Sequence, residues 1–365
     1  VRALRKPLAI AGILLVAALL YLLLWPVPID PVAWEAPEDL GFVDPFGPDD
    51  RLARAKSIDL GDYEGPEDLS RGIDGQYYAT VADGLVIRID ANGDVHAFAQ
   101  VGGRPLGIET AADGSLLVAN AYLGIQRVSL DGSVETLLAA VDGQPLVYAD
   151  DLAIAGDGTI YFSEASTKHG AKSSGGSYEA SRRDIMEHGG HGRVIAYDPA
   201  SGEAEVVITG LQFANGVAIS DDQRYLLVAE TGAYRILKHW LQGPAAGTTD
   251  VIVDNLPGFP DNINNGLNGR FWIGLVAPRI ASLDALSTRP FLRKIVQRLP
   301  SIMRPRALPS SHVIAITGDG LVLMNLQDPA ARFASLTGVL ETRDALYLTA
   351  LFGNQLGVLR KKDLR

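Results

Sequence analysis

The stretch DDLAIAGDGTIYFSEA, from Asp150 to Ala165, places a turn between two apolar runs. Asp157-Gly158 is a dipeptide that favours a tight hairpin turn. The run TIYFSEA that follows it is rich in β-branched and aromatic residues, which fit a strand. The stretch therefore predicts two antiparallel strands joined by a short turn.

The same arrangement recurs six times along the chain. The turns begin at Asp74, Asp113, Asp157, Asp222, Asn268 and Asp344, and the runs after them are QYYATV, SLLVAN, TIYFSEA, RYLLVAE, RFWIGL and LYLTAL. A recurring unit of about 40 residues built of short strands is typical of a β-propeller. The sequence thus predicts an all-β fold, a six-bladed propeller, with insertions in the two long intervals at about 166–191 and 278–309. The alternative is a β-sandwich with irregular strands.

Composition narrows the classes of function. The formal net charge of -11 argues against a nucleic-acid partner, because binding phosphates needs a basic face. The chain has no cysteine, which excludes disulfides, thiol catalysis and cysteine-ligated zinc. Hydrophobic residues make up 47% and charged residues 21%, a normal balance for a globular protein.

The N-terminal run LAIAGILLVAALLYLLLW, from Leu8 to Trp25, carries no charge and follows Arg2, Arg5 and Lys6. It predicts a single membrane-spanning helix with the rest of the chain on the non-cytoplasmic side, the periplasmic face of the inner membrane in a bacterium. A cleaved signal peptide is the alternative, although Trp25-Pro26 is a poor cleavage site. The predicted divisions are a stub and anchor at 1–27, a Pro-rich linker at 28–50 and the propeller at 51–365.

Oxygen-bearing residues recur at a fixed distance before the turns. The positions seven residues before each turn are Glu67, Leu106, Asp150, Asn215, Asp261 and Thr337, and the next positions are Asp68, Gly107, Asp151, Gly216, Asn262 and Gly338. In a propeller these positions are equivalent and lie near the axis. Carboxylates gathered there would repel one another unless a cation lay among them, and oxygen ligands of this kind suit calcium. The alternative is that each side chain bonds its own backbone in a turn.

Several segments resemble the strictosidine synthase-like proteins, in particular the branch of the adipocyte plasma membrane-associated proteins. They are RPLGI at 104–108, FANGVAIS at 213–220, LLVAET at 226–231, YRILKHWLQGPAAG at 234–247, DNLPGFPDNI at 254–263 and STRPFLRKIV at 287–296. The wider superfamily includes paraoxonase-like and gluconolactonase-like hydrolases. The resemblance implies a calcium ion at the propeller mouth, held by Glu67, Asp150, Asn215, Asp261 and Asn262. It also implies a second, structural metal at Asp68 and Asp151.

The chain departs from these relatives in three ways. Asp150 stands where paraoxonase-like enzymes often have Asn. Their channel histidines would align with Leu106 and Ala121, so that pair is absent. Glu341 lies near the position of the acid used by strictosidine synthase, although it also precedes a turn, where a solvated Glu is the simpler interpretation.

The leading hypothesis is metal-assisted hydrolysis of an ester or lactone, with the metal polarising the carbonyl and Asp261, or else Asp150, acting as the base. The predicted pocket residues are Leu106, Tyr148, Thr337 and Glu341, with Arg104 at the border of the ring. The first alternative is a strictosidine synthase-type lyase that uses Glu341. The second is a calcium-stabilised binding scaffold at the membrane without catalysis.

The two insertions carry further candidates. Six basic residues at Arg289, Arg293, Lys294, Arg298, Arg304 and Arg306 accompany apolar residues at helical spacing, which fits a helix on lipid headgroups, a lid or an ordinary packed helix. His169, His188 and His191 suggest a transition-metal site or, as the favoured interpretation, a mobile loop over the mouth. His239 and His312 are expected to be structural.

Overall fold

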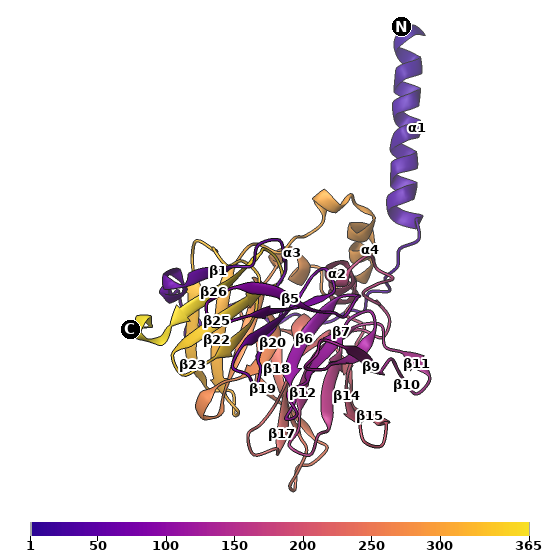
Figure 1. Ribbon diagram of the computed structural model, residues 1–365. Coiled ribbons are helices and arrows are strands. Elements are labelled where there is room, and N and C mark those ends of the chain that lie inside the picture. The colour runs from indigo at the N-terminus through magenta and orange to yellow at the C-terminus, as the bar shows by residue number, and fades with distance from the viewer. Residues whose placement is uncertain (1, 365) are drawn as a thin grey trace.

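The computed structural model describes residues 2–364 and contains six four-stranded antiparallel sheets arranged around one axis (Figure 1). The first three blades are β2–β5 (Leu69–Arg71, Tyr77–Val81, Leu85–Ile89, Val95–Gln100), β6–β9 (Pro105–Thr110, Leu116–Asn120, Gly124–Val128, Val134–Leu138) and β12–β15 (Ala149–Ile154, Ile160–Glu164, Gly192–Asp198, Glu203–Leu211). The next two are β16–β19 (Ala214–Ile219, Tyr225–Glu230, Arg235–Trp240, Thr249–Val253) and β20–β23 (Gly258–Asn265, Arg270–Pro278, Ser311–Thr317, Val322–Asp328). The six-bladed propeller predicted from the repeat is confirmed, and each predicted turn joins the first two strands of a blade.

The sixth blade closes the ring. It consists of β24 (Leu336–Glu341), β25 (Ala345–Ala350) and β26 (Gln355–Arg360), and its outer strand is β1 (Lys56–Asp59) from the other end of the domain. Lys56 pairs with Val358 and Asp59 with Gln355. The first and last strands of the propeller are not adjacent in sequence, so backbone hydrogen bonds between β1 and β26 close the ring.

The blades stack through apolar side chains. Val86 of the first blade packs in one cluster with Leu116 and Val118 of the second. Ala79 and Leu356 join the first blade to the sixth in the same way. Both faces of a blade are covered by its neighbours, which is why β7 (LLVAN) is buried at all five positions instead of alternating.

Polar side chains also tie neighbouring blades together. Asp68 Oδ2 accepts the backbone N–H of Ile108, and Asp151 Oδ2 accepts that of Val217, at 3.0 and 2.9 Å. Asn264 Oδ1 accepts the N–H of Val339 at 2.9 Å. The N–H groups that donate these bonds follow Gly107, Gly216 and Gly338, which sit where a side chain would collide with the neighbouring blade.

Both insertions lie on one face of the propeller. α2 (Ser177–Glu187) belongs to the first, and α3 (Ala281–Asp284) and α4 (Pro290–Arg298) belong to the second. Figure 1 shows these helices together above the blades, next to the base of α1. The remaining short elements are β10 (Ala140–Val141), β11 (Gln144–Pro145), η1 (Arg51–Arg54), η2 (Thr231–Ala233), η3 (Leu267–Gly269), η4 (Ser301–Met303) and η5 (Lys361–Asp363).

The N-terminal segment is helical, as α1 (Arg2–Leu24), but the prediction of a membrane span needs correction. Across residues 2–364, no helix combines the length and apolarity needed to cross a membrane.

The Pro-rich segment after α1 is a strap that packs on the propeller. Ile29 is fully buried, and the N–H of Val32 donates to the carbonyl of Glu187. Trp34 stacks on His188 with ring centroids 3.9 Å apart. Arg298 of α4 donates to the carbonyls of Leu22 and Trp25, which fixes the end of α1 against the second insertion.

The close contact between blades predicts that Gly216→Ala destabilises the protein. An added Cβ would lie 2.3 Å from the backbone nitrogen of Ile263 and 2.6 Å from the carbonyl oxygen of Asp261. Backbone atoms cannot move aside cheaply, so we expect a loss of about 3 kcal/mol in the free energy of unfolding. Denaturant titration measures it. Gly156→Ala is the control because its Cβ finds no atom closer than 3.7 Å, and equal stability of the two variants would contradict this packing.

Candidate metal centre and pocket

The residues predicted to form the ring meet at the axis because the inner strands share an irregularity. In β12, Ala149 and Leu152 pair with Glu164 and Phe162, so the inner strand holds one more residue than its partner. The same one-residue bulge occurs at the equivalent place in β6, β16, β20 and β24. A bulge turns a side chain away from the pleat, and its repetition aims the ring side chains at a common centre.

Five oxygen-bearing side chains come together there, as the sequence predicted. They are Glu67, Asp150, Asn215, Asp261 and Asn262, and each is at most 7% exposed. Asn215 Nδ2 donates to Asp261 Oδ1 at 2.5 Å, and Asn262 Nδ2 donates to Glu67 Oε1 at 3.1 Å. These contacts join the fourth blade to the fifth, and the fifth to the first.

Three oxygens of this ring are buried without any hydrogen-bond partner in the described part of the chain: Glu67 Oε2, Asn215 Oδ1 and Asn262 Oδ1. Buried polar atoms are nearly always paired, because an unpaired one loses its water without compensation. In each of these three side chains the other polar atom, the amide nitrogen or the second carboxylate oxygen, already forms a hydrogen bond. The unpaired oxygens are thus available to a cation, and the alternative that each residue caps its own backbone does not describe them.

The charges of the ring are strongly unfavourable in the absence of a cation. Burial, and then repulsion from Asp261 and Asp150, raises the pKa of Glu67 well above its usual value. Burial, followed by the charge of Asp261, likewise raises the pKa of Asp150, and burial raises the pKa of Asp261 to about 7. Arg104 is the cation that acts on Glu67 and Asp150, and its Nη1 is buried without a partner.

This donor set fits calcium. All its ligands are oxygens, three of them are carboxylates, and calcium accepts six to eight oxygens in irregular geometry. Glu67, Asp150, Asn215, Asp261 and Asn262 are the residues that would hold the ion. Asp68 and Asp151, predicted as a second metal site, instead already accept backbone N–H bonds on both oxygens. A second metal there stays a prediction.

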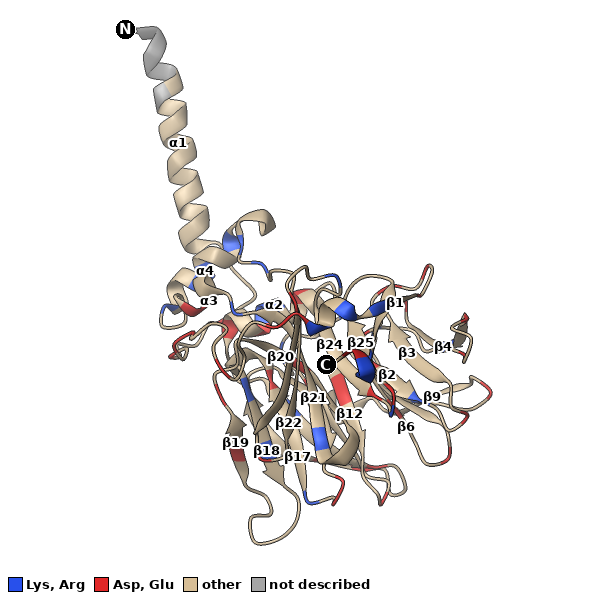
Figure 2. Cartoon of the chain, turned by 90° about the vertical axis from the view of Figure 1, so that its left-hand side faces the viewer, with Lys and Arg blue, Asp and Glu red and all other residues tan. Residues whose placement is uncertain are grey.

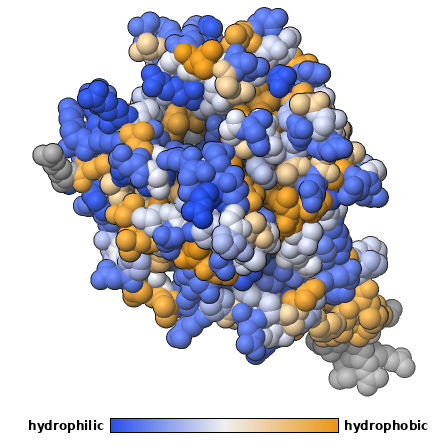
Figure 3. Space-filling model, turned by 90° about the horizontal axis from the view of Figure 1, so that it is seen from below, coloured by the Kyte–Doolittle hydropathy of each residue, from blue (hydrophilic) through white to orange (hydrophobic). Residues whose placement is uncertain are grey.

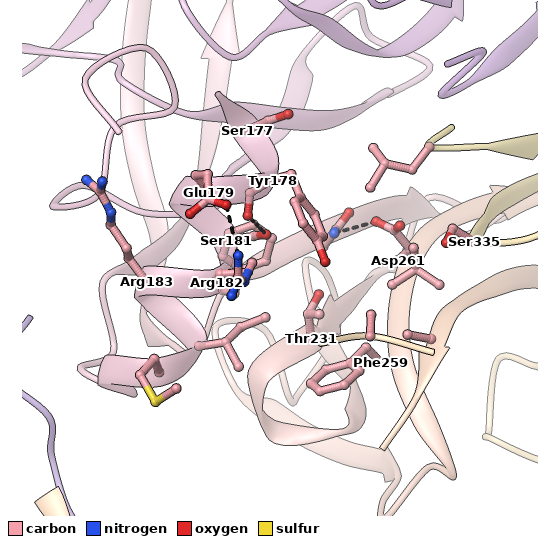
Figure 4. Close-up of a pocket in the computed structure, with 18 of the residues that line it drawn as sticks. Ser177, Tyr178, Glu179, Ser181, Arg182, Arg183, Thr231, Phe259, Asp261 and Ser335 are labelled. Atoms are coloured by element: carbon pink, nitrogen blue, oxygen red, sulfur yellow. Dashed lines mark hydrogen bonds and ion pairs between the residues drawn. The ribbon is translucent and has the colours of Figure 1, made fainter. Parts of the chain in front are cut away.

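The ring forms the floor of a pocket of about 1180 Å³, a volume that includes its open mouth. Figure 4 shows Asp261 facing this space, with α2 residues opposite. Leu106 and Tyr148 line it, as predicted. The walls are mostly apolar. They include Tyr178, Ile185 and Met186 from the first insertion, Phe213, Phe259, Val276 and Phe352 from blade edges and loops, and Leu283, Arg304 and Ala307 from the second insertion.

The other two predicted pocket residues lie elsewhere. Thr337 is behind the ring, where its hydroxyl donates to the backbone carbonyl of Glu67 at 2.5 Å. Glu341 is at the far end of β24, where its carboxylate pairs with Lys361 at 2.5 Å and accepts the indole N–H of Trp272 at 2.9 Å. Its side chain is 1% exposed, so neither the pocket role nor the solvated interpretation is right.

The insertions also differ from two expectations. The loop with His169, His188 and His191 contains α2 and packs closely, so a mobile loop is the wrong description. Arg293 is fully buried and donates to the carbonyls of Met186 and Ser287, so it does not face lipid headgroups. Other residues of the second insertion, such as Leu283 and Arg304, line the pocket. Contact of the segment 289–306 with lipid headgroups stays a prediction.

The α2 residues Tyr178, Ile185 and Met186 line the pocket although no sequence pattern indicated this role. The sequence carries little information on this role, because it does not show which residues an apolar side chain in an insertion will contact. His239 and His312 bond Thr249 and Asn325, in line with their expected structural roles.

Comparison with known sequences supports the resemblance. The chain is 33% identical over 353 residues to the adipocyte plasma membrane-associated protein of Bos taurus, across 88% of this chain and 82% of that protein. It is 36% identical over 206 residues to strictosidine synthase-like 13 of Arabidopsis thaliana, across 55% of this chain and 49% of that protein. The families described as strictosidine synthase and strictosidine synthase-like, N-terminal, match residues 150–244 and 44–89.

Solved structures agree with the fold. A gluconolactonase from Xanthomonas campestris aligns with a TM-score of 0.60 at 17% identity, across 92% of this chain and 96% of that one. The calcium-binding protein regucalcin from Agrobacterium tumefaciens aligns with a TM-score of 0.56 at 12% identity, across 84% and 92%. At these identities the likeness concerns the propeller fold alone.

The raised carboxyl pKa values predict how the stability of the calcium-free protein changes with pH. Asp261, with an ordinary pKa of 3.8 and a folded pKa of about 7, binds more protons in the folded state between these values. The free energy of unfolding therefore falls as pH rises through this window, and the loss is complete above it.

We expect the melting temperature of chelator-treated protein to fall between pH 5 and pH 8, and calcium to restore it at pH 8. Asp261→Asn, which cannot ionise, should show a smaller fall. A melting temperature that rises over the same range would contradict the repulsion in the ring.

Proposed function

Since the chain belongs to the strictosidine synthase-like family, in the branch of the adipocyte plasma membrane-associated proteins, we propose that it is a calcium-dependent hydrolase of esters or lactones. The observation that carries the proposal is the ring of oxygen ligands, three of them unpaired, on the floor of a deep apolar pocket. A carbonyl group that enters this pocket reaches the only cluster of carboxylates that lines it among the described residues.

Calcium, when bound, supplies an electrophile that polarises the carbonyl and stabilises the oxyanion. The remaining roles belong to the protein. Asp261 is buried on the floor of the pocket, where its carboxylate is suited to take a proton from the attacking water. Asn215 Nδ2 holds Asp261 Oδ1, so the second oxygen of this carboxylate is the one that receives the proton. The proton then passes to the departing alkoxide. Asp150 is the alternative base.

The walls of the pocket favour a substrate with an apolar body. Aromatic and aliphatic side chains such as Tyr178, Phe213 and Phe259 bury apolar surface and keep bulk water away from the carbonyl. Arg104, beside Glu67 and Asp150, provides the positive charge closest to the ring on the protein side. A hydrophobic ester or lactone matches this combination better than a sugar acid.

The two alternative functions are a lyase, which the position of Glu341 disfavours, and a binding scaffold, which an assay can distinguish from a hydrolase. The lyase requires Glu341 in the pocket, and this residue is instead held by Lys361 and Trp272. The binding scaffold is favoured by one observation: no histidine is among the residues that line the pocket in the described chain, so the base rests on a carboxylate alone. Calcium binding without turnover would select the scaffold.

We further propose that α1 attaches the protein to a membrane, as the name of the adipocyte plasma membrane-associated proteins suggests. Its residues Ile13, Leu14 and Leu24 are at least 64% exposed, and the part of α1 that Figure 2 colours is tan, without acidic or basic residues. The face of the molecule seen from below in Figure 3 mixes hydrophilic and apolar residues. Because α2 and α4 lie at its base, the pocket would open toward the lipid.

Attachment through α1 predicts that a double change, Leu14→Asp with Ile13→Asp, releases the protein from phosphatidylcholine vesicles in a sedimentation assay. The exposed charges oppose burial of the helix in lipid. Leu130→Asp, an exposed apolar residue on the propeller, serves as the control and should leave binding intact. Release by the control alone would refute attachment through α1.

The hydrolase proposal predicts that Asp261→Asn lowers kcat by about 10²- to 10⁴-fold, the usual contribution of a general base. Phenyl acetate and a γ-lactone with an alkyl chain are the substrates, assayed before and after chelation and after calcium is returned. The exposed Asp62→Asn is the matched control and should keep full activity. Bound calcium with no hydrolysis by the wild-type chain would contradict the proposal.

A further inference from the structure

A second cluster of metal-ligating side chains lies outside the ring, in the first insertion. His169 Nε2 is 2.8 Å from Glu187 Oε2, and His191 Nε2 is 2.9 Å from Glu187 Oε1. One ligand atom from each of the three residues lies within 4.8 Å of the other two. Glu187 is 2% exposed and His169 is 4% exposed, so the cluster belongs to the interior and not to the surface.

The local sequence DIMEHGGH builds this arrangement. α2 ends at Glu187, and His188 and Gly190 take left-handed backbone angles, with φ of 54° and 70°. The chain thereby turns back, and His191 faces Glu187 four residues earlier. A Cβ on Gly189 would lie 2.3 Å from Nε2 of His191, so only glycine leaves room for this imidazole against Glu187.

We propose that His169, Glu187 and His191 bind a zinc ion, with water as the fourth ligand. Two imidazole nitrogens and one carboxylate oxygen form a ligand set that zinc takes in tetrahedral sites with one open position. Imidazole selects zinc and its transition-metal neighbours over calcium, which prefers oxygen. This site is therefore distinct from the oxygen ring, and the inference does not rest on the hydrolase proposal.

In the absence of metal, Glu187 has other partners that zinc must replace. Lys168 Nζ lies 2.5 Å from Glu187 Oε1, and the backbone N–H of Asp30 donates to Oε2 at 3.0 Å. The lysine side chain is 36% exposed and already lies 3.5 Å from the exposed carboxylate of Asp30. It can thus move to Asp30 and water when a divalent ion takes its place, while the two histidines lose the protons on Nε2.

Asp184 is a further acidic group next to the cluster. Its side chain is buried, the Ser166 hydroxyl acts on its carboxylate as a hydrogen-bond donor, and it lies one turn before Glu187 on α2. Its charge interacts with those of His191, Glu187 and Lys168. A divalent ion on Glu187 would offset the negative charge of this buried carboxylate.

The position of the cluster gives the ion a structural role. Ile185 and Met186 of α2 line the pocket, and the next residue, Glu187, holds the strap through both its carboxylate and its carbonyl. An ion on Glu187 would join the pocket wall to the strap and to the start of β14.

The test is a zinc titration of the full-length protein in detergent by calorimetry, with excess calcium present so that the oxygen ring is saturated. We expect one zinc per chain and, with cobalt as substitute, the visible absorption of a tetrahedral site. His191→Ala should weaken zinc binding by at least about 100-fold. Loss of a residue that only hydrogen-bonds a ligand costs about 10- to 100-fold in affinity, and loss of a direct ligand costs more. Its calcium content should not change.

Two further variants separate the metal site from a simple ion-pair cluster. Lys168→Met removes the competing cation and should tighten zinc binding, whereas an ion-pair cluster would bind no zinc in either form. His96→Ala, which removes an exposed imidazole elsewhere, should bind zinc like the wild type. No zinc bound at 100-fold excess over protein, or equal affinity in His191→Ala and the wild type, would overturn the inference.

Discussion

The repulsion between buried carboxylates at the axis is the constraint on which the rest of the molecule depends. Six inner strands converge, and the same bulge in five of them turns a side chain inward. Asp150 and Asp261 are thereby placed close to Glu67 in the buried ring, and each of the three has a raised pKa. Such a site persists only because the blades around it are held by other contacts, and it is the natural place for a divalent cation.

Those contacts come from the layer of polar residues next to the ring. Asp68, Asp151 and Asn264 bind backbone N–H groups of the neighbouring blade. Gly338 leaves room for Asn264, and Gly107 leaves room for Asp151. One set of acids is therefore satisfied by the backbone and holds the blades together. The other set keeps unpaired oxygens and faces the pocket. Residues adjacent in sequence, such as Asp150 and Asp151, thus divide between a site and its support.

The insertions turn an open propeller mouth into a walled pocket. α2 and the segment around Arg304 add apolar and basic side chains to the pocket walls, and the strap after α1 is bonded to Glu187 at the end of α2. Glu187 joins these parts, since it contacts two histidines, a lysine and the strap. Any ligand that binds the pocket or this cluster therefore acts on the same helix.

The sequence by itself determined the number of blades, the positions of the two insertions and the ring residues. These follow from local rules, because a turn dipeptide and the strand after it have the same spacing in every blade, so equivalent positions can be counted. What only the tertiary structure decided concerns residues distant in sequence. Glu341 contacts Lys361 and Trp272. Arg293 is buried and donates to the carbonyl of Met186. Residues from two separate insertions form part of the pocket walls. No local pattern encodes those partners, because they are chosen by how whole blades and helices pack in space.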